Sequence, residues 1–169
     1  GEYTIVASTF DPGKVGNFVL TVRSSTRFTC DAIPLEGEGM YRKTIEGHWE
    51  LQINAMGSKR GPEFFLNPQF WITATAQTRI RIRLQAPAIK PSPALNITLF
   101  QRDEKAKSMV EVASSGPYID WIQGVVLRDF SLYAGGAYAV VFSTWKPVSG
   151  SYTAFMYTDK PVDVRQAEP

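Results

Sequence analysis

Cysteine and histidine are almost absent from this chain of 169 residues, which contains one of each, Cys30 and His48. A single cysteine excludes a disulfide bond within the chain, which is typical of a reducing compartment, so we expect a cytoplasmic protein. A Cys–His pair is the minimum for thiolate catalysis, because the histidine must accept the thiol proton. The segment Phe28–Asp31 lacks the glycine-rich or helix N-terminal surroundings that activate a thiolate, and no papain-like cysteine signature occurs. We therefore expect no catalytic residues in this chain.

Long apolar runs are also missing. No segment approaches the roughly 18 apolar residues that span a bilayer, and no signal peptide opens the chain. The net charge of +2 is too small to indicate a nucleic-acid partner. Hydrophobic residues make up 44% and charged residues 20%, so the chain can bury a core of its own. Because the sequence begins abruptly in a strand-like segment, we expect a piece of a longer protein.

Clusters of acidic residues, which a calcium site needs, are scarce as well. Ca²⁺ takes six to eight oxygen ligands, so a calcium site needs several carboxylates from neighbouring loops. This sequence contains no Asp-x-Asp, and the acidic pair Asp103–Glu104 stands among basic residues, as in a solvated turn. No helical period is convincing, so no glycine-rich phosphate loop precedes a helix. We expect no metal and no cofactor.

What the chain does contain is a repeat of one stretch. Gly1–Pro12 and Gly136–Pro147 share the pattern Gly-x-Tyr-x-x-Val-x-Ser-Thr-aromatic-x-Pro, displaced by 135 residues. Each copy continues, after a glycine, into a second strand-like segment, Gly16–Val22 and Gly150–Met156. A period of this length is the size of a whole domain, which excludes a solenoid of short repeats.

The repeat predicts the domain organisation. We expect the terminal hairpin of a preceding domain copy, a linker, a complete second copy and a tail, at residues 1–24, 25–47, 48–160 and 161–169. The linker range is rich in Ser, Thr, Gly and charged residues, which favour irregular structure.

Short segments rich in Val, Ile, Thr and aromatic residues fill the complete copy, as expected for strands. The clearest is Thr78–Gln85, in which Ile80, Ile82 and Leu84 alternate with three arginines and so point to the opposite face. Eight strands are expected, at 49–54, 68–75, 78–85, 95–100, 109–113, 125–133, 137–145 and 151–158. Their number and spacing predict an all-β fold, an antiparallel eight-stranded β-sandwich.

Several motifs give this sandwich a family resemblance. They are the repeated Tyr-x-x-Val-x-Ser-Thr-x-x-Pro pattern, Trp49 followed by a glycine-rich loop, and Asn67–Phe70. Together they resemble the C2-like domain, or domain III, of calpains, and a hairpin before a whole second copy resembles the tandem arrangement of atypical calpains. Pro34–Met40 and Ser115–Tyr118 are most similar to segments of fungal PalB-type calpain-like proteases. The loop at Met56–Ser58 departs from the usual Ala-Gly-Gly.

This resemblance implies a function for the parent protein. Calpain-like proteins of this kind are cytosolic papain-like cysteine proteases with a catalytic core upstream of the C2-like repeats. PalB-type members act in ambient-pH signalling and process a zinc-finger transcription factor on endosomal ESCRT-III assemblies. The resemblance therefore implies that the partners of this chain are its own protease core and ESCRT-III subunits, with recruitment to endosomes.

The sharpest candidate binding feature is the row of Arg79, Arg81 and Arg83, in which neighbouring side chains lie roughly 7 Å apart on one strand face. Such a row suits an acidic protein surface or an anionic membrane, and Lys59 and Arg60 in the preceding loop are candidates to extend it. The alternative interpretation is a solvated outer strand face with cross-strand Asp or Glu partners.

Two hypotheses follow for the chain itself. It is either a non-catalytic interaction and regulatory module of a calpain-like protease, or a peripheral module that binds acidic phospholipid without calcium. A domain that only braces the protease is a third alternative. The aromatic residues before the repeated prolines, Phe10 and Trp145, are expected to plug the end of the sandwich and not to bind a ligand.

Overall fold

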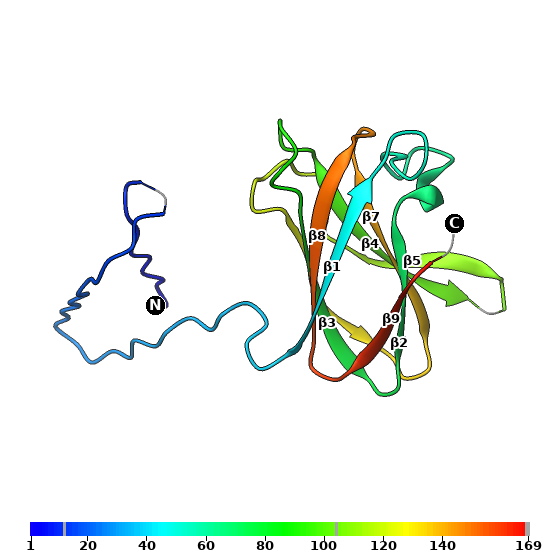
Figure 1. Cartoon of the computed structure of the whole chain (residues 1–169). Coiled ribbons are helices and arrows are strands. Elements are labelled where there is room, and N and C mark those ends of the chain that lie inside the picture. The colour runs from blue at the N-terminus through cyan, green and yellow to red at the C-terminus, as the bar shows by residue number, and fades with distance from the viewer. Residues whose placement is uncertain (12, 104, 168–169) are drawn as a thin grey trace. The chain divides into compact units, whose positions relative to one another are not determined.

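A computed structural model describes residues 1–11, 13–103 and 105–167 of the chain (Figure 1). The chain divides into two compact units, residues 1–33 and 34–169. The described residues of the first unit are exposed and contain no helix or strand. The hairpin expected in residues 1–24 has its turn at Pro12, outside the described residues, so it stays a prediction. No helix among the described residues is long and apolar enough to cross a membrane.

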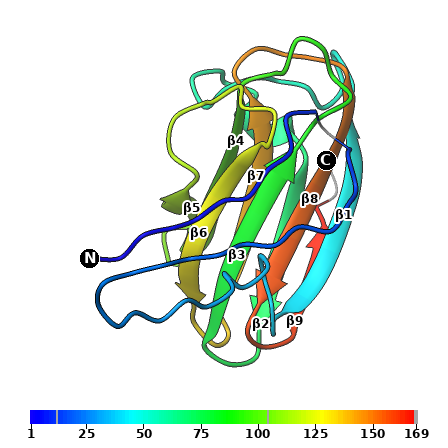
Figure 2. The same ribbon diagram turned by 90° about the vertical axis from the view of Figure 1, so that its left-hand side faces the viewer.

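The second unit consists of two antiparallel sheets, which confirms the expected all-β sandwich (Figures 1 and 2). One sheet has four strands in the order β1-β8-β3-β6, and the other has five in the order β5-β4-β7-β2-β9. The strands are β1 (Tyr41–Trp49), β2 (Gln69–Ala74), β3 (Thr78–Gln85), β4 (Leu95–Asp103), β5 (Ser108–Ser114), β6 (Val125–Leu132), β7 (Ala137–Thr144), β8 (Gly150–Thr158) and β9 (Val162–Gln166). A short 3₁₀ helix, η1 (Phe64–Leu66), precedes β2.

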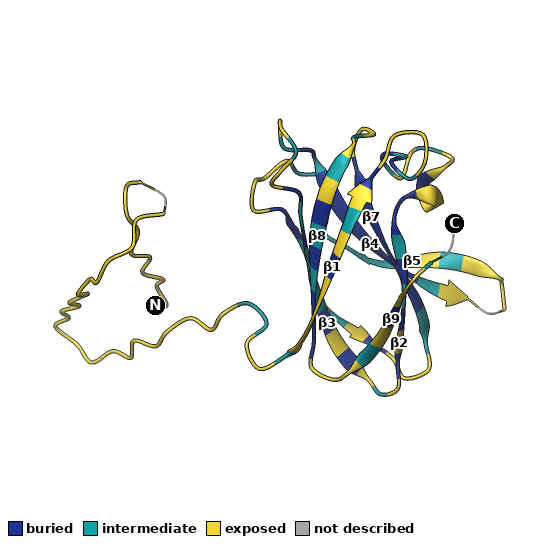
Figure 3. Cartoon of the chain, viewed as in Figure 1, coloured by how far each residue is buried: buried dark blue, intermediate teal, exposed yellow. Residues whose placement is uncertain are grey.

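The main core fills the space between the two sheets, and Figure 3 shows buried positions on strands of both sheets, whereas the edge strand β1 is mostly exposed. In β3 the predicted alternation holds, because Ile80, Ile82 and Leu84 are fully buried. Each such side chain contributes about 1.5–3 kcal/mol when it is removed from water. Strand β7 is buried on both faces, since Phe64 of η1 packs with Phe100 and Val141 in a second, smaller cluster.

The first strand differs from the expectation, which placed residues up to 47 in a linker and a strand at 49–54. Strand β1 lies at the edge of its sheet and pairs only with β8, so most of its side chains are exposed and its sequence is rich in charge. The chain then turns at residues 50–54, where the side chain of Asn54 accepts a hydrogen bond from the backbone N–H of Glu50 and donates one to the carbonyl of His48. This closed turn ends the strand at Trp49.

The last strand was also not expected. The range predicted as a tail, 161–169, contains β9, which pairs with β2, so the described residues form nine strands and not eight. Strand β9 is short and lies at a sheet edge, and only Val164 is buried in it. The Lys43 Nζ of β1 donates a hydrogen bond of 2.9 Å to the carbonyl of Val164, which joins the edges of the two sheets.

Candidate functional site

The arginine row, Arg79, Arg81 and Arg83, lies on the outer face of β3 as the alternation predicts. Their side chains become progressively less exposed along the strand, at 57%, 35% and 24%. The flanking strands in this sheet are β8 and β6. The row therefore runs along an interior strand of the four-stranded sheet.

Each arginine of the row faces a carboxylate. Arg81 donates two hydrogen bonds, of 2.9 and 3.0 Å, to Asp129 of β6. Arg79 lies 3.7 Å from Asp159, which also accepts the backbone N–H of Arg79. The hydrogen bond to Asp129 raises the pKa of Arg81 above its ordinary value. These contacts fit the interpretation in which the row has acidic partners within its own domain.

The third partner comes from the chain segment that enters the sandwich. Arg83 donates hydrogen bonds of 2.6 and 2.9 Å to Glu36 and a third, of 3.1 Å, to the carbonyl of Gln123. The hydrogen bond to Glu36 raises the pKa of Arg83. This bidentate geometry is the strong form of an arginine–carboxylate contact.

Residues 34–40, which we call the docking turn, lie against the same sheet face. Gly37 has a φ of +72°, and a Cβ atom there would lie 2.0 Å from the ring of the buried Tyr157 of β8. The turn is closed from within, because the backbone N–H of Glu38 bonds to the carbonyl of Leu35. The docking turn lines a cavity of about 330 Å³ together with Arg79, Arg81 and Asp129. A segment expected to be an irregular linker is thus partly ordered, and its ion pair is with Arg83.

Lys59 and Arg60 do not extend the row. Lys59 Nζ lies 2.9 Å from both carboxylate oxygens of Glu111 in β5, which belongs to the other sheet. The guanidinium of Arg60 lies over the ring of Trp145, 5.1 Å from its centroid, just after β7. The two basic residues therefore belong to a second site.

This second site is a cleft of about 580 Å³, here called the Trp145 cleft. Its lining includes Lys59, Arg60, Ala94, Pro117, Tyr118 and Trp145. Trp145 is 41% exposed, so it does not plug the sandwich end as expected. It contacts Tyr118 edge to face, with 5.5 Å between the ring centroids. The sequence signal for this site is the aromatic position before the repeated proline, which we expected to plug the end of the sandwich.

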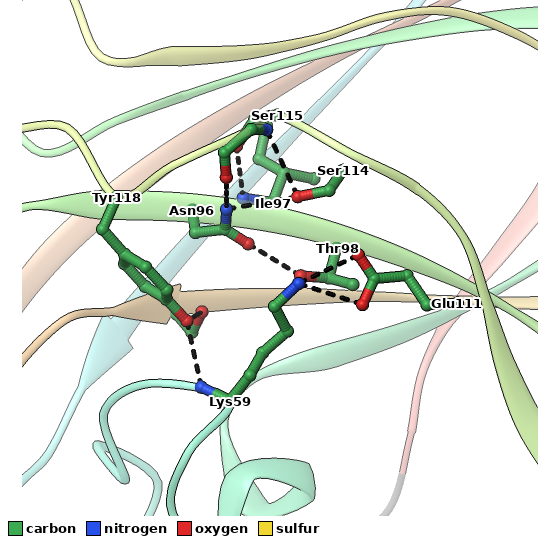
Figure 4. A network of polar contacts seen from close by, with 10 residues as sticks. Lys59, Asn96, Ile97, Thr98, Glu111, Ser114, Ser115 and Tyr118 are labelled. Carbon is green, nitrogen blue, oxygen red and sulfur yellow. Dashed lines mark hydrogen bonds and ion pairs between the residues drawn. The ribbon is translucent and has the colours of Figure 1, made fainter.

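A network of polar contacts links Lys59 and Tyr118 of the cleft lining to residues of core strands (Figure 4). The Tyr118 hydroxyl lies 2.9 Å from Oγ of the buried Ser143 and accepts the backbone N–H of Lys59. Nearby, the fully buried Asn96 donates to the carbonyl of Gly116 and accepts from Thr98 Oγ1. Ser143 of β7 and Asn96 of β4 therefore hold two lining residues of the cleft, Tyr118 and Gly116, against core strands.

The described residues considered for catalysis or metal binding, His48, Cys30 and Asp103, are not gathered into a comparable site. The two ring nitrogens of His48 lie 3.3 and 3.4 Å from the hydroxyls of Ser151 and Ser149. Cys30 is an exposed free thiol in the first unit. Within the described residues no group of three or more His, Cys, Asp or Glu side chains gathers around one point. Of the acidic pair Asp103–Glu104, Glu104 lies outside the described residues.

Comparison with known proteins finds fungal relatives. The chain is 29% identical over 157 residues to the calpain-like protease palB/RIM13 of Cryptococcus neoformans var. neoformans, a match that covers 93% of this chain. It is 31% identical over 142 residues to the calpain-like protease palB of Emericella nidulans, and 30% identical over 136 residues to its Aspergillus oryzae counterpart, each covering 80% of this chain. These matches confirm the resemblance to PalB-type calpain-like proteases.

The matched regions are small parts of those proteins. The chain spans 19% of the Cryptococcus protein and 15% of the other two. No family model matches the chain. A chain from the virus-like particle of Macrobrachium rosenbergii extra small virus aligns with 86% of this chain and 97% of its own length, at 16% identity and a TM-score of 0.18. That score is too low to bear on the fold or the function.

Proposed function

We propose that this chain is a non-catalytic interaction and regulatory module of a PalB-type calpain-like cysteine protease. The fungal relatives support the parent family. The observation that carries the module's role is the docking turn, which is held on the arginine row where the chain enters the sandwich. Segments that connect domains are usually mobile and make few contacts, whereas this one makes a bidentate ion pair and packs on Tyr157.

The arginine row acts in this proposal as the acceptor of acidic segments. It already holds three carboxylates from different parts of its own domain, those of Glu36, Asp129 and Asp159. Arg79 is the most exposed of the row and has the longest contact, at 3.7 Å. A carboxylate from a partner therefore competes first for Arg79, next to the docking turn. Electrostatic pairing of this kind contributes more to specificity and association rate than to affinity.

The partners proposed are those that the resemblance implies, namely the protease core of the same protein and ESCRT-III subunits. The parent protease would process a zinc-finger transcription factor in ambient-pH signalling, in the cytoplasm and at endosomes. This module would position the core or the partner and perform no chemistry. Proteolytic activity in the isolated chain that Cys30→Ala abolishes would contradict this role.

We also propose that residues 1–24 are the terminal strands of a preceding C2-like copy. The repeat supports this assignment, because Gly1–Pro12 matches the segment that contains β7. The match to the Cryptococcus protein covers 157 residues, more than the 136 residues of the second unit, so it extends into the first.

The test is a pull-down of this chain against purified ESCRT-III subunits and against acidic liposomes. Wild type is compared with a variant in which all three arginines of the row are changed to Gln, and with Arg165→Gln as a control on exposed β9. Thermal unfolding of each variant checks that the sandwich remains folded. Binding of a subunit by wild type and by the control, and its loss in the row variant, is the expected result. Wild type that binds neither bait overturns ESCRT-III subunits as partners and leaves the protease core of the same protein as the proposed partner.

Liposome binding without subunit binding would favour the membrane alternative. The specific feature behind that alternative is the position of three cations on one sheet face, each worth about 1 kcal/mol near an anionic surface. Such binding would fall as salt is added and would be lost in the row variant. The carboxylates that face each arginine reduce this attraction, so we place the protein partner first.

A further inference from the structure

The Trp145 cleft has the features of a preformed binding site. Its walls are tied to core strands, since the Trp145 backbone N–H bonds to the carbonyl of Ala94 and Tyr118 bonds to the buried Ser143. The loop that carries Lys59 and Arg60 is held by Asn67, whose buried amide donates to the carbonyls of Gly57 and Phe64. Sites whose walls do not rearrange lose less entropy when a ligand binds.

The cleft combines an apolar surface with one cation that has no acidic partner among the described residues. Trp145 and Tyr118 form a continuous aromatic surface, and Pro117 and Ala94 extend it. The Lys59 ammonium is neutralised by Glu111. Arg60 forms no ion pair with a described carboxylate and instead lies over the Trp145 ring. An arginine stacked on an aromatic ring keeps its in-plane N–H donors free for a carboxylate.

We propose that the Trp145 cleft binds an extended segment of a partner protein in which a proline adjoins an acidic residue. The proline ring packs on Trp145 and Tyr118, because prolines of extended peptides dock on aromatic surfaces with little loss of chain entropy. The carboxylate forms a bidentate pair with Arg60. The uncompensated charge of Arg60 is what selects an acidic segment over a neutral proline-rich one. This site lies on the other sheet from the arginine row and does not depend on the role proposed for that row.

The experiment titrates the whole chain with a synthetic peptide that contains Pro-Pro-Glu-Pro. Two matched peptides replace the Glu by Gln or all prolines by Ala. Binding is followed by calorimetry and by the NMR signal of the Trp145 indole N–H, at peptide concentrations up to the millimolar range. The protein variants are Arg60→Gln, Trp145→Ala and, as a control, Trp121→Ala, an exposed tryptophan outside the cleft lining.

We expect the acidic proline peptide to shift the Trp145 signal and both matched peptides to bind more weakly. Arg60→Gln should weaken binding by at least about tenfold, the lower end of the range for one charge-assisted hydrogen bond. Trp145→Ala should weaken it by about tenfold or more, as for aromatic anchors that a bound partner covers, while Trp121→Ala binds like wild type. Because Arg60 is exposed, its variant tests the site even if Trp145→Ala unfolds.

Other results would overturn the proposal. One is the absence of any shift at millimolar peptide. Another is equal binding of the proline-free peptide, which would mean attraction by charge alone. Binding that survives in both Arg60→Gln and Trp145→Ala would place the peptide elsewhere. A single-stranded oligonucleotide that shifts the Trp145 signal where the peptide does not would assign the cleft to a different class of ligand.

Discussion

Arg83 and Glu36 hold one another through two hydrogen bonds of 2.6 and 2.9 Å across a sequence separation of 47 residues. Both side chains are less than one third exposed. The pair joins the docking turn to a strand in the middle of the four-stranded sheet. The position of the docking turn therefore depends on the folded sheet that carries Arg83.

The first prediction concerns that pair. Glu36→Gln removes the charge and should lower the free energy of unfolding by about 1 kcal/mol, the usual value for a partly exposed ion pair. Amide exchange at Glu38 and Met40, whose N–H groups close the docking turn, should become faster. Arg79→Gln is the control, because its ion pair of 3.7 Å is longer and more exposed. Equal losses of stability in the two variants would contradict a special role for Glu36.

The second prediction separates backbone strain from packing in the docking turn. Gly37 and Gly39 have nearly the same positive φ, +72° and +73°, but only Gly37 lies against a side chain, that of Tyr157. Gly39→Ala should cost about 1–2 kcal/mol for the left-handed backbone alone. Gly37→Ala should cost at least about 1 kcal/mol more, because its Cβ would meet the buried ring. Chemical denaturation measures both, and equal costs would mean that the turn does not pack on Tyr157 in solution.

The third prediction concerns Asn67, which begins Asn67–Phe70, one of the segments that resemble the C2-like domain of calpains. Its side chain is buried and serves three backbone groups, accepting from the N–H of Met56 and donating to the carbonyls of Gly57 and Phe64. Asn67→Ala should cost about 2–4 kcal/mol, since buried backbone groups lose their partners. Asn54→Ala, at an exposed turn with two such bonds, should cost less. Denaturant unfolding of the two variants decides the order.

The sequence predicted strands best where one face of the strand is buried and the other is exposed to solvent. In β3 the strict alternation of Ile80, Ile82 and Leu84 with arginines marked the strand and its buried face correctly. It failed at the sheet edges, where β1 and β9 bury few side chains and so carry little periodic signal. Edge strands are defined by pairing with a distant partner, and no local pattern encodes that partner.

The candidate sites were predictable only in part. The row of arginines followed from strand geometry, but its partner Glu36 lies 47 residues away and was assigned to a linker. Lys59 and Arg60 were grouped with the row because both are basic, whereas the long loop carries them to the other sheet. The exposure of Trp145 also depends on how loops meet at the sandwich end, which composition does not reveal.

The fourth prediction concerns alkaline pH. Burial raises the pKa of Tyr152, whose ring packs 4.5 Å from that of Trp49 and 5.7 Å from that of Phe142. In the unfolded chain a tyrosine ionises at roughly pH 10. Since the folded-state pKa is higher, the free energy of unfolding is unaffected below that pH and falls as the pH rises above it. Wild type should therefore lose stability more steeply than Tyr152→Phe above roughly pH 10, and parallel curves would contradict this.

The fifth prediction follows from the repeat and the topology together. In the complete copy β7 pairs with β4 and β2, whereas β8 pairs with β1 and β3 in the other sheet. Residues 3–10 and 17–23 repeat these two strands, so in a preceding copy we expect them in opposite sheets and not paired with one another. Tyr3 and Ile5 take the places of Tyr138 and Val140, which are fully buried, yet both are exposed in this chain.

Hydrogen exchange tests this directly. The amides of 3–10 and 17–23 should exchange fast in the 169-residue chain, where they form no strand among the described residues. In a longer protein that includes the sequence preceding this chain, they should become protected, because the remaining strands of the copy then supply partners. The matched control is β7, whose amides should be protected equally in both proteins. Protection of 3–10 and 17–23 already in the shorter chain, with cross-strand contacts between them, would show instead that they form a hairpin of their own, and the assignment to opposite sheets would be wrong.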